Sequence, residues 1–379
     1  MLVAENDLKE KCFISKLTSE EIKKAKKEKW FCPGCHSQVI IKSGKVNRSH
    51  FAHKTRETCD LFSENESEEH LTGKELIANN CDKYGIEYEV EAFLPELNQR
   101  PDVLIQEKIA IEFQCSALSL ERFKERTESY LNNGYQVIWL LGEKFHLKNK
   151  LSALQKQFIY FSESKGFYMW ECSVEKEEIS LIYFLVSTFL ELHFKRQTYS
   201  LNHFSFLDLI SLPNQVLKKE RKITSSIKNY EEQQYKWNQQ LTSKKPKTME
   251  LQAYLYKNGQ NLRCIDTEFF YPSFLTPLLM EEELRLRYLI YDYLITNKNV
   301  TYTELLEYLK EKENFSNYSL VSQEKLLGYC LSLYLCFLKE QHIIRVDEPG
   351  TFTIINKETT KEVKWEILWL PLKYVMISK

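Results

Sequence analysis

The chain of 379 residues carries 52 Lys and Arg against 53 Asp and Glu, so its formal net charge is only −1 at pH 7. This balance argues neither for nor against a nucleic-acid partner, while 43% hydrophobic and 28% charged residues indicate a globular rather than a disordered chain. The length predicts two or three domains. No segment reaches the ~18 uninterrupted apolar residues of a membrane span, and the first residues, MLVAENDLKEKC, lack the layout of a signal peptide. We therefore expect a cytoplasmic protein whose cysteines are reduced thiols or metal ligands.

Residues 1–62 are predicted to form a small lobe held by zinc. A short strand and a lysine-rich helix are followed by four potential ligands, Cys32, Cys35, His50 and His53. The turn CPGC aims two thiolates at one point, VIIKSGKV returns the chain as a hairpin, and HFAH would place two imidazoles at i and i+3 on one helical face. Cys₂His₂ is a closed tetrahedral set for structural zinc. His36 and Cys59 lie nearby, and Cys59 could replace one ligand.

The same lobe is rich in basic residues that could contact DNA phosphates. The residues that we expect to make these contacts are Lys42, Lys45 and Arg48. Basic clusters of this kind suit phosphate binding. A lysine run such as that at 23–29 is also common on a solvent-exposed helix face, so this run alone does not indicate DNA binding.

Residues 63–205 are predicted to form an α/β domain with a β-hairpin extension. The elements in chain order are a helix over 65–84, a strand over 87–94, two strands within 100–116, a helix over 120–133 and a strand over 136–142. Acidic residues in the first turn and Gly85 at the end support the first helix. The strand-like pieces FIYF and GFYMWEC flank a plausible turn and predict the extension.

The stretch RPDVLIQEKIAIEFQCS at 100–116 predicts a hairpin with two facing acids. A three-residue turn places Ile105 opposite Ile109 and continues to Asp102 opposite Glu112. The apolar face would then consist of Val103, Ile105, Ile109, Ile111 and Phe113, and a one-residue slip would split that face. On the other face lie Asp102, Glu112 and Gln114. Facing like charges repel unless a cation such as Mg²⁺ or Mn²⁺ lies between them. A plain solvent-exposed polar face is the alternative.

Four motifs in order resemble those of the competence protein CoiA family, and the helix–three strands–helix–strand order resembles the PD-(D/E)xK nuclease superfamily. The motifs are CPGC…HFAHK, EEHLTGKELI, RPDVLI…AIEFQCS and RTESYLNNGYQVIWLLG, which together span residues 30–142. The resemblance implies a restriction-endonuclease-like αβββαβ core. It also implies a DNA-processing role in natural transformation, around the recombination step.

The resemblance also implies roles for individual residues. Asp102 and Glu112 would hold a catalytic Mg²⁺ or Mn²⁺, and His70 and Lys74 would reach the same site from one helical face. Gln114 stands where the superfamily usually has Lys, and it supplies a hydrogen bond but no positive charge. Lys74 would fill that role. Two further expectations are Arg126 as a phosphate contact and Glu66 as a third carboxylate, although both could be ordinary surface residues.

The C-terminal half is predicted to hold a basic helical connector over 206–264, with a break at SKKPK, and a mostly helical domain over 265–379. Three helices followed by two strands about the turn DEPG suggest a winged-helix-like arrangement. The last helix, LLGYCLSLYLCFL, is apolar on nearly every side, so it must be buried or paired with another protein. We therefore expect protein docking or homo-oligomer formation here rather than DNA reading.

Taken together, these observations predict a multidomain α/β protein, and two functions remain open. The first is a Mg²⁺- or Mn²⁺-dependent deoxyribonuclease that acts on incoming transforming DNA, with single-stranded DNA as the expected form. The second is a non-hydrolytic DNA-binding adaptor that uses a nuclease fold to hand DNA to recombination proteins. A zinc-containing transcription regulator is a weaker third reading, because it leaves the paired acids unexplained.

Overall fold

A computed structural model describes most of the chain as two compact units. The first unit comprises Met1–Lys148, Met169–Ile182 and Arg196–Pro213, and the second comprises Asn149–Tyr168, Tyr183–Lys195 and Asn214–Lys379. The four-part division expected from the sequence stays a prediction. The residues that the structure describes are 1–44, 48–54, 67–162, 165–187, 192–211, 222–225, 227–266, 269, 276–277, 280–313, 318–347, 350–355 and 365–368.

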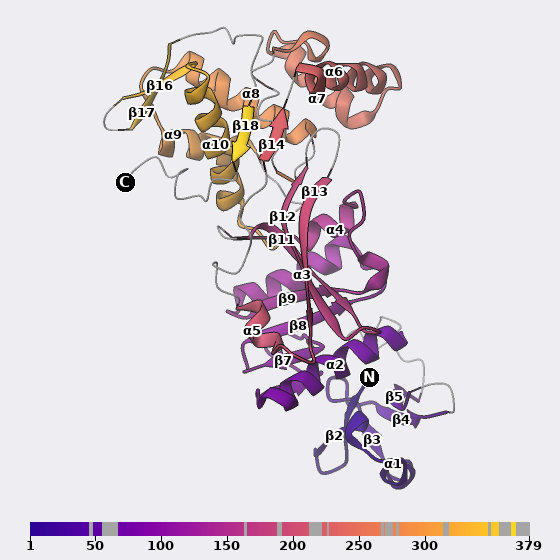
Figure 1. Ribbon diagram of the computed structural model, residues 1–379. Helices are drawn as coiled ribbons and strands as arrows, with labels where there is room; N and C mark the ends of the chain where they lie inside the picture. Colours follow the sequence, from indigo (N-terminus) through magenta and orange to yellow (C-terminus); the bar gives the residue numbers. More distant parts are fainter. Residues whose placement is uncertain are drawn as a thin grey trace. The chain divides into compact units, whose positions relative to one another are not determined.

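The N-terminal lobe of the first unit contains an antiparallel sheet of five strands in the order β2-β1-β3-β4-β5. Strands β2 to β5 and helix α1 of this lobe are labelled in Figure 1. The strands are β1 (Val3–Glu5), β2 (Lys11–Phe13), β3 (Trp30–Phe31), β4 (Gln38–Lys42) and β5 (His50–His53). Helix α1 (Ser19–Ala25) starts at a capping box between Thr18 and Glu21. The segment HFAH was expected to be helical, and this expectation is wrong. It forms β5, because Phe51 is buried in the lobe core while β5 pairs along its length with β4.

The nuclease-like part of the first unit has the element order predicted from the sequence. The elements are α2 (Glu68–Tyr84), β6 (Tyr88–Val90), β7 (Val103–Ile105), β8 (Ile109–Gln114), α3 (Leu120–Asn132) and β9 (Gln136–Leu141). Strands β6, β7 and β8 pair antiparallel, and the crossover through α3 makes β8 and β9 parallel. Helix α2 begins at the N-cap Ser67 and ends at Gly85 in the left-handed conformation.

The β7–β8 hairpin has the predicted register. Ile105 lies opposite Ile109 and Val103 opposite Ile111. Along β8, neighbouring side chains point to opposite faces of the sheet. Phe113 packs so closely against α2 that a Cβ added to Gly73 would lie 2.8 Å from its ring, whereas Glu112 is hydrogen-bonded by Tyr130 of α3. Helices α2 and α3 therefore cover opposite faces of the hairpin.

The sheet continues beyond the nuclease-like core in the order β13-β12-β11-β9-β8-β7-β6. The added strands are β11 (Gly166–Ser173), β12 (Glu178–Ser187) and β13 (Leu192–Ser200), and β10 (Tyr160–Ser162) pairs with β11 as the predicted hairpin. Strand β13 was not predicted. In the first unit, α5 (Phe206–Ile210) is fastened to α2 by Asn80, whose side chain accepts from Phe206 N–H and donates to the carbonyls of Leu201 and Phe204.

The second unit is mostly helical. Its elements include α4 (Ala153–Gln157), β14 (Lys222–Ser225), α6 (Ile227–Thr242), α7 (Pro246–Lys257), α8 (Met280–Thr296), β15 (Val300–Thr301), α9 (Tyr302–Lys312), α10 (Gln323–Glu340), β16 (Ile344–Asp347), β17 (Thr351–Ile354) and β18 (Trp365–Leu368). The break at SKKPK separates α6 from α7, as predicted. Both helices also contribute buried side chains, because Trp237 and Leu255 are fully buried and α7 packs on α8.

Helices α8, α9 and α10 and the small sheet β15-β17-β16 occupy the region expected to be winged-helix-like, a comparison that stays a prediction. From Leu326 to Leu338 every residue of α10 is buried or half-buried. The apolar surface of this helix is therefore used inside the fold, and it gives no reason to expect a homo-oligomer. In the described part of the chain, no helix combines the length and the apolar character that crossing a membrane requires.

Candidate functional site

The N-terminal lobe brings three of the four predicted zinc ligands together. The ligand atoms of Cys32, Cys35 and His53 all lie within 4.8 Å of one another, and Cys35 Sγ is 3.3 Å from His53 Nε2. His50 is not part of this group. Positions i and i+3 face opposite sides of a strand, and His50 Nδ1 lies 2.9 Å from the carbonyl oxygen of Arg48. The expected pair of histidines on one face was therefore wrong, because it assumed a helix.

This three-residue group has the chemistry of a zinc site. Burial raises the pKa of the Cys32 thiol. Burial acts the same way on Cys35, but hydrogen bonds with Ser37 and His53 lower the pKa of Cys35 to about 6. A lowered pKa favours the thiolate, the form that binds metal. Two sulfur donors and one imidazole fit Zn²⁺, which takes four ligands in structural sites. Cys59, the alternative fourth ligand, lies outside the described residues.

A second group of charged residues lies where α2 meets the start of β7. We call it the α2 cluster, and its members are His70, Lys74, Glu91, Arg100 and Asp102. Asp102 accepts a hydrogen bond from Phe113 N–H at 2.7 Å, its Oδ2 is 2.9 Å from His70 Nε2, and its Oδ1 is 3.2 Å from Lys74 Nζ. Burial alone would raise the pKa of Asp102, but the charges of His70 and Lys74 hold it well below its usual range.

Sequence reasoning missed Glu91, the second carboxylate of the α2 cluster. Its Oε1 accepts from Lys74 Nζ at 2.8 Å, and its Oε2 is 3.2 Å from Arg100 Nη1. The Lys74 side chain is only 1% exposed, between Glu91 and Asp102, so its ammonium is held inside the fold. Nothing in the segment EYEVEAFL distinguishes Glu91 from an ordinary strand residue. The Glu91 side chain reaches Lys74 because the chain leaves β6 at Glu91 with a φ of +52°.

Glu112 belongs to a separate group on the other face of the hairpin. We call it the α3 cluster, and its members are Glu112, Arg126 and Tyr130. Arg126 forms an ion pair with Glu112 Oε1, and Tyr130 Oη donates to the same oxygen at 2.7 Å. Burial, followed by the charge of Glu112, raises the pKa of Tyr130 well above its usual range. Arg126 neutralises Glu112, and its expected contact with phosphate stays a prediction.

The two motif acids therefore do not form the facing pair expected from the hairpin. Strand β7 begins at Val103, so the alternation of side chains does not extend to Asp102, which turns toward α2 instead. Within the described residues, three or more His, Cys, Asp or Glu ligand atoms gather only at Cys32, Cys35 and His53. Asp102 and Glu112 each have protein partners on opposite faces of the hairpin, so this arrangement does not bring them together as a shared Mg²⁺ or Mn²⁺ site.

The remaining predicted residues have mostly structural partners or lie outside the described residues. Gln114 is buried and donates through Nε2 to the carbonyl of Ser116 at 2.8 Å. Arg48 forms an ion pair with Glu75 of α2. Lys42 is exposed at the end of β4. Lys45 and Glu66 lie outside the described residues, so their expected roles stay predictions.

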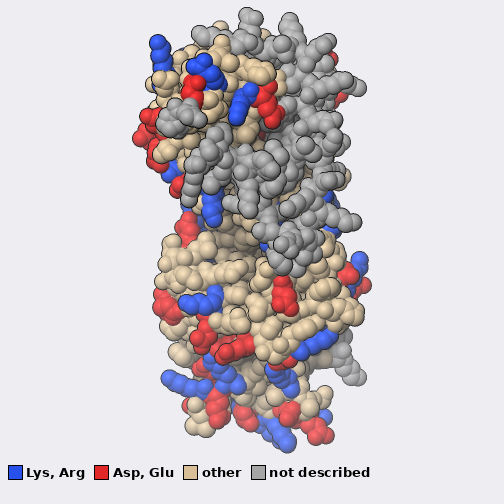
Figure 2. All heavy atoms as spheres, turned by 60° about the vertical axis from the view of Figure 1, so that its left-hand side comes forward, with Lys and Arg blue, Asp and Glu red and all other residues tan. Residues whose placement is uncertain are grey.

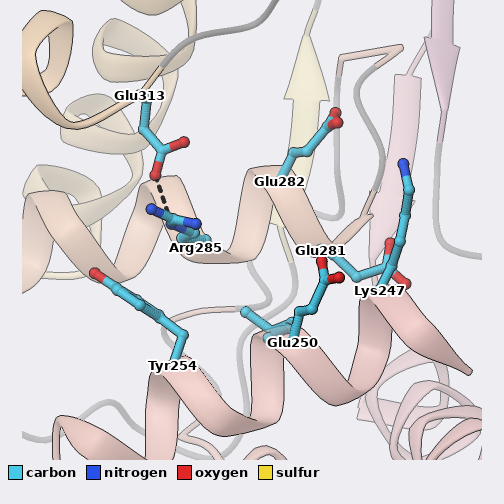
Figure 3. A pocket seen from close by; sticks show the side chains of 8 residues that line it. Lys247, Glu250, Tyr254, Glu281, Glu282, Arg285 and Glu313 are labelled. Atoms are coloured by element: carbon cyan, nitrogen blue, oxygen red, sulfur yellow. Dashed lines mark ion pairs between the residues drawn. The ribbon is translucent and has the colours of Figure 1, made fainter. Parts of the chain in front are cut away.

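The second unit contains a pocket of about 160 Å³ with an acidic lining. Figure 3 shows Arg285 directed toward Glu313, and its Nε lies 2.7 Å from Glu313 Oε1. The residues that line the pocket are Lys247, Glu250, Leu251, Tyr254, Glu281, Glu282, Arg285 and Glu313. Four carboxylates against two cations make this pocket unsuited to a phosphate group.

Comparisons with known proteins give the family. Residues 66–214 match the model of the nuclease-like domain of competence protein CoiA, and residues 14–62 match the model of its N-terminal domain. Competence protein CoiA of Bacillus subtilis (strain 168) is 32% identical over 129 residues, which are 33% of this chain. That match spans about a third, 35%, of the length of this relative. No solved structure matches the chain. The chain belongs to the competence protein CoiA family.

Proposed function

We propose that this chain is a competence protein that acts on incoming transforming DNA, and that it hydrolyses phosphodiester bonds at the α2 cluster. The family and its nuclease-like domain support the role in competence. The observation that carries the chemistry is the pairing of His70 Nε2 with Asp102 Oδ2 at 2.9 Å, next to the buried Lys74. A histidine oriented by a buried carboxylate is a common general base.

In this proposal His70, Asp102 and Lys74 have distinct tasks. When His70 Nε2 carries its proton toward Asp102, Nδ1 is the nitrogen that can accept a proton from an attacking water. Asp102 fixes this tautomer and stabilises the imidazolium that forms. Lys74 keeps Asp102 ionised rather than contacting DNA. His70 also lies in the first turn of α2, where the partial positive charge of the helix end favours a phosphate group.

A divalent cation is not assigned a step, because Asp102 and Glu112 have separate protein partners. The need for Mg²⁺ or Mn²⁺ stays a prediction from the family resemblance. Zinc is proposed only for the lobe, where Cys32, Cys35 and His53 would hold it and where it would stabilise a small fold. Contacts of Lys42, Lys45 and Arg48 with DNA, and a preference for single-stranded DNA, are further parts of this proposal.

The test uses full-length protein with single-stranded and duplex DNA, each with Mg²⁺, with Mn²⁺ or with chelator. We expect cleavage by the native protein and a loss of about 10²–10⁴-fold in His70→Gln and Asp102→Ala, the usual contribution of a general base. Lys124→Ala, a change in an exposed ion pair on α3, is the control and should cleave normally. Cleavage that persists in Asp102→Ala would refute the assignment of the site.

A non-hydrolytic adaptor is the second candidate, because the side chains of two motif residues are bound to other groups of the fold. Glu112 is bound by Arg126 and Tyr130, and Gln114 by the backbone of Ser116. On the face shown in Figure 2, the Lys and Arg side chains of the described residues are interspersed with Asp and Glu rather than gathered into one basic patch. Tight DNA binding without cleavage under any metal condition, with a steep salt dependence, would favour the adaptor.

A further inference from the structure

Glu91 accepts hydrogen bonds from the N-terminal lobe as well as from the α2 cluster. Its Oε2 accepts from the backbone N–H groups of Leu2 at 2.9 Å and Val3 at 3.1 Å. Its Oε1 accepts from Lys74 Nζ at 2.8 Å. Because the Glu91 side chain is only 1% exposed, it has no access to a DNA substrate. One buried carboxylate thus joins strand β1 of the lobe to the lysine behind Asp102.

The backbone of Glu91 is also part of the site. Its N–H donates to the carbonyl oxygen of Asp102 at 3.0 Å, which fixes the turn that precedes β7. Its φ of +52° lies in the left-handed region, which is unfavourable for a residue with a Cβ atom. Such a conformation persists where the surrounding contacts over-determine it. The side-chain bonds to Leu2, Val3 and Lys74 are contacts of this kind.

The lobe end of this link reaches the strand that carries His53. The backbone N–H of Phe51 donates to the carbonyl of Met1 at 2.9 Å, and Phe51 lies two residues before His53 on β5. Leu2, next to Met1, then donates to Glu91. The path from the metal-ligand strand to Lys74 therefore passes through backbone hydrogen bonds and one carboxylate, all within the first unit.

We propose that Glu91 is a positioning residue that holds Lys74 against Asp102 and links this arrangement to the metal-binding lobe. In this proposal the lobe contributes no residue to the α2 cluster and acts on its geometry through Glu91. The proposal rests on the proposed function only in assigning the α2 cluster to DNA cleavage. The link itself is tested without DNA.

The experiment compares the full-length variants Glu91→Gln and Glu89→Gln by amide hydrogen exchange. Glu89 is a matched control, because it lies on β6 and binds Lys11 of the lobe, but its side chain is 44% exposed. The Gln side chain at position 91 carries no negative charge, so it accepts weaker hydrogen bonds from Leu2, Val3 and Lys74. We expect exchange in residues 1–5 and 109–114 to become about tenfold faster in Glu91→Gln, the effect of losing a charge-assisted hydrogen bond. Glu89→Gln should exchange like the native protein.

Each outcome of the exchange experiment decides the proposal. Equal exchange rates in Glu91→Gln and the native protein overturn it. If circular dichroism shows that Glu91→Gln does not fold, the double variant Lys74→Gln/Glu91→Gln removes both charges together. Faster exchange in residues 1–5 of that variant then supports the link, and unchanged exchange overturns it.

Steady-state kinetics separate this proposal from the proposed function. If the native protein cleaves DNA, Glu91→Gln should lower kcat by about tenfold or more and leave KM unchanged, because Glu91 does not touch DNA. An unchanged kcat overturns the positioning role. If the native protein does not cleave DNA at all, the proposed function fails, while the exchange rates still decide whether Glu91 joins the lobe to Lys74.

Discussion

The α2 and α3 clusters each hold a motif acid on one face of the same hairpin, but their partners differ. Glu112 in the α3 cluster is held by a single guanidinium and a phenol. Asp102 in the α2 cluster shares Lys74 with a second carboxylate, and it also orients a histidine whose side chain is 15% exposed. Arg126 is 14% exposed, about as much as His70, so the two clusters differ in the kind of partner: Glu112 is bound by a guanidinium and a phenol, whereas Asp102 orients an imidazole, a common general base. The partners of an acid, and not its place in a motif, indicate whether it can do chemistry.

The strongest test of this comparison replaces the central cation of each cluster. Lys74→Met removes the cation that two buried carboxylates share; Glu91 keeps Arg100 and Asp102 keeps His70, and we expect a loss of about 3–5 kcal/mol in the free energy of unfolding, as for other broken buried ion pairs. Arg126→Met leaves Glu112 with Tyr130, and the expected loss is about 1.5–3 kcal/mol. Urea denaturation measures both, with Lys124→Met as a surface control. Equal losses in the two variants would mean that the clusters do not differ as described.

The contribution of Asp102 to stability should also depend on pH. The pKa of Asp102 is lowered on folding, so its contribution is present at neutral pH and is lost as the pH falls below about 4, the ordinary value of Asp. Asp102→Asn should cost about 1.5–3 kcal/mol at pH 7, and this difference should shrink as the pH falls. Denaturation at a series of pH values measures it. Asp7→Asn, at an exposed position, is the control, and its free energy of unfolding should follow that of the native protein at every pH. A cost of Asp102→Asn that does not change with pH would contradict the prediction.

Packing between α2 and β8 is a third way to perturb one cluster alone. Gly73→Ala would place a Cβ 2.8 Å from the Phe113 ring, and overpacking of this kind costs about 1–3 kcal/mol. The ring of Phe113 also lies 6.2 Å from that of His70, nearly parallel to it. DNA cleavage should therefore fall together with stability. The double variant Gly73→Ala/Phe113→Leu should recover part of the loss in stability and part of the loss in cleavage. If Gly73→Ala changes neither stability nor cleavage, the contact between Gly73 and Phe113 is loose.

The sequence predicts the order of elements and the hairpin register, because both follow from short-range patterns. Gly85 ends α2 as predicted, and the alternating apolar residues of the hairpin permit one register, whereas the N-cap Ser67 was not singled out from the sequence. The side-chain partners were not predictable in this way. Asp102 lies one residue outside a strand, where alternation no longer applies. Glu91 acts through contacts with Leu2 and Val3, nearly ninety residues earlier, and no local pattern reports such a contact.

The smallest expected effects come from the N-caps of the two helices. Ser67 accepts from His70 N–H at the start of α2, and Ser119 accepts from Arg122 N–H at the start of α3. Replacing either with Ala should lower the free energy of unfolding by about 1 kcal/mol. Only Ser67→Ala should also slow DNA cleavage, because the turn that it loosens carries His70. If Ser119→Ala slows cleavage as much as Ser67→Ala at equal stability, the chemistry does not belong to the α2 cluster alone.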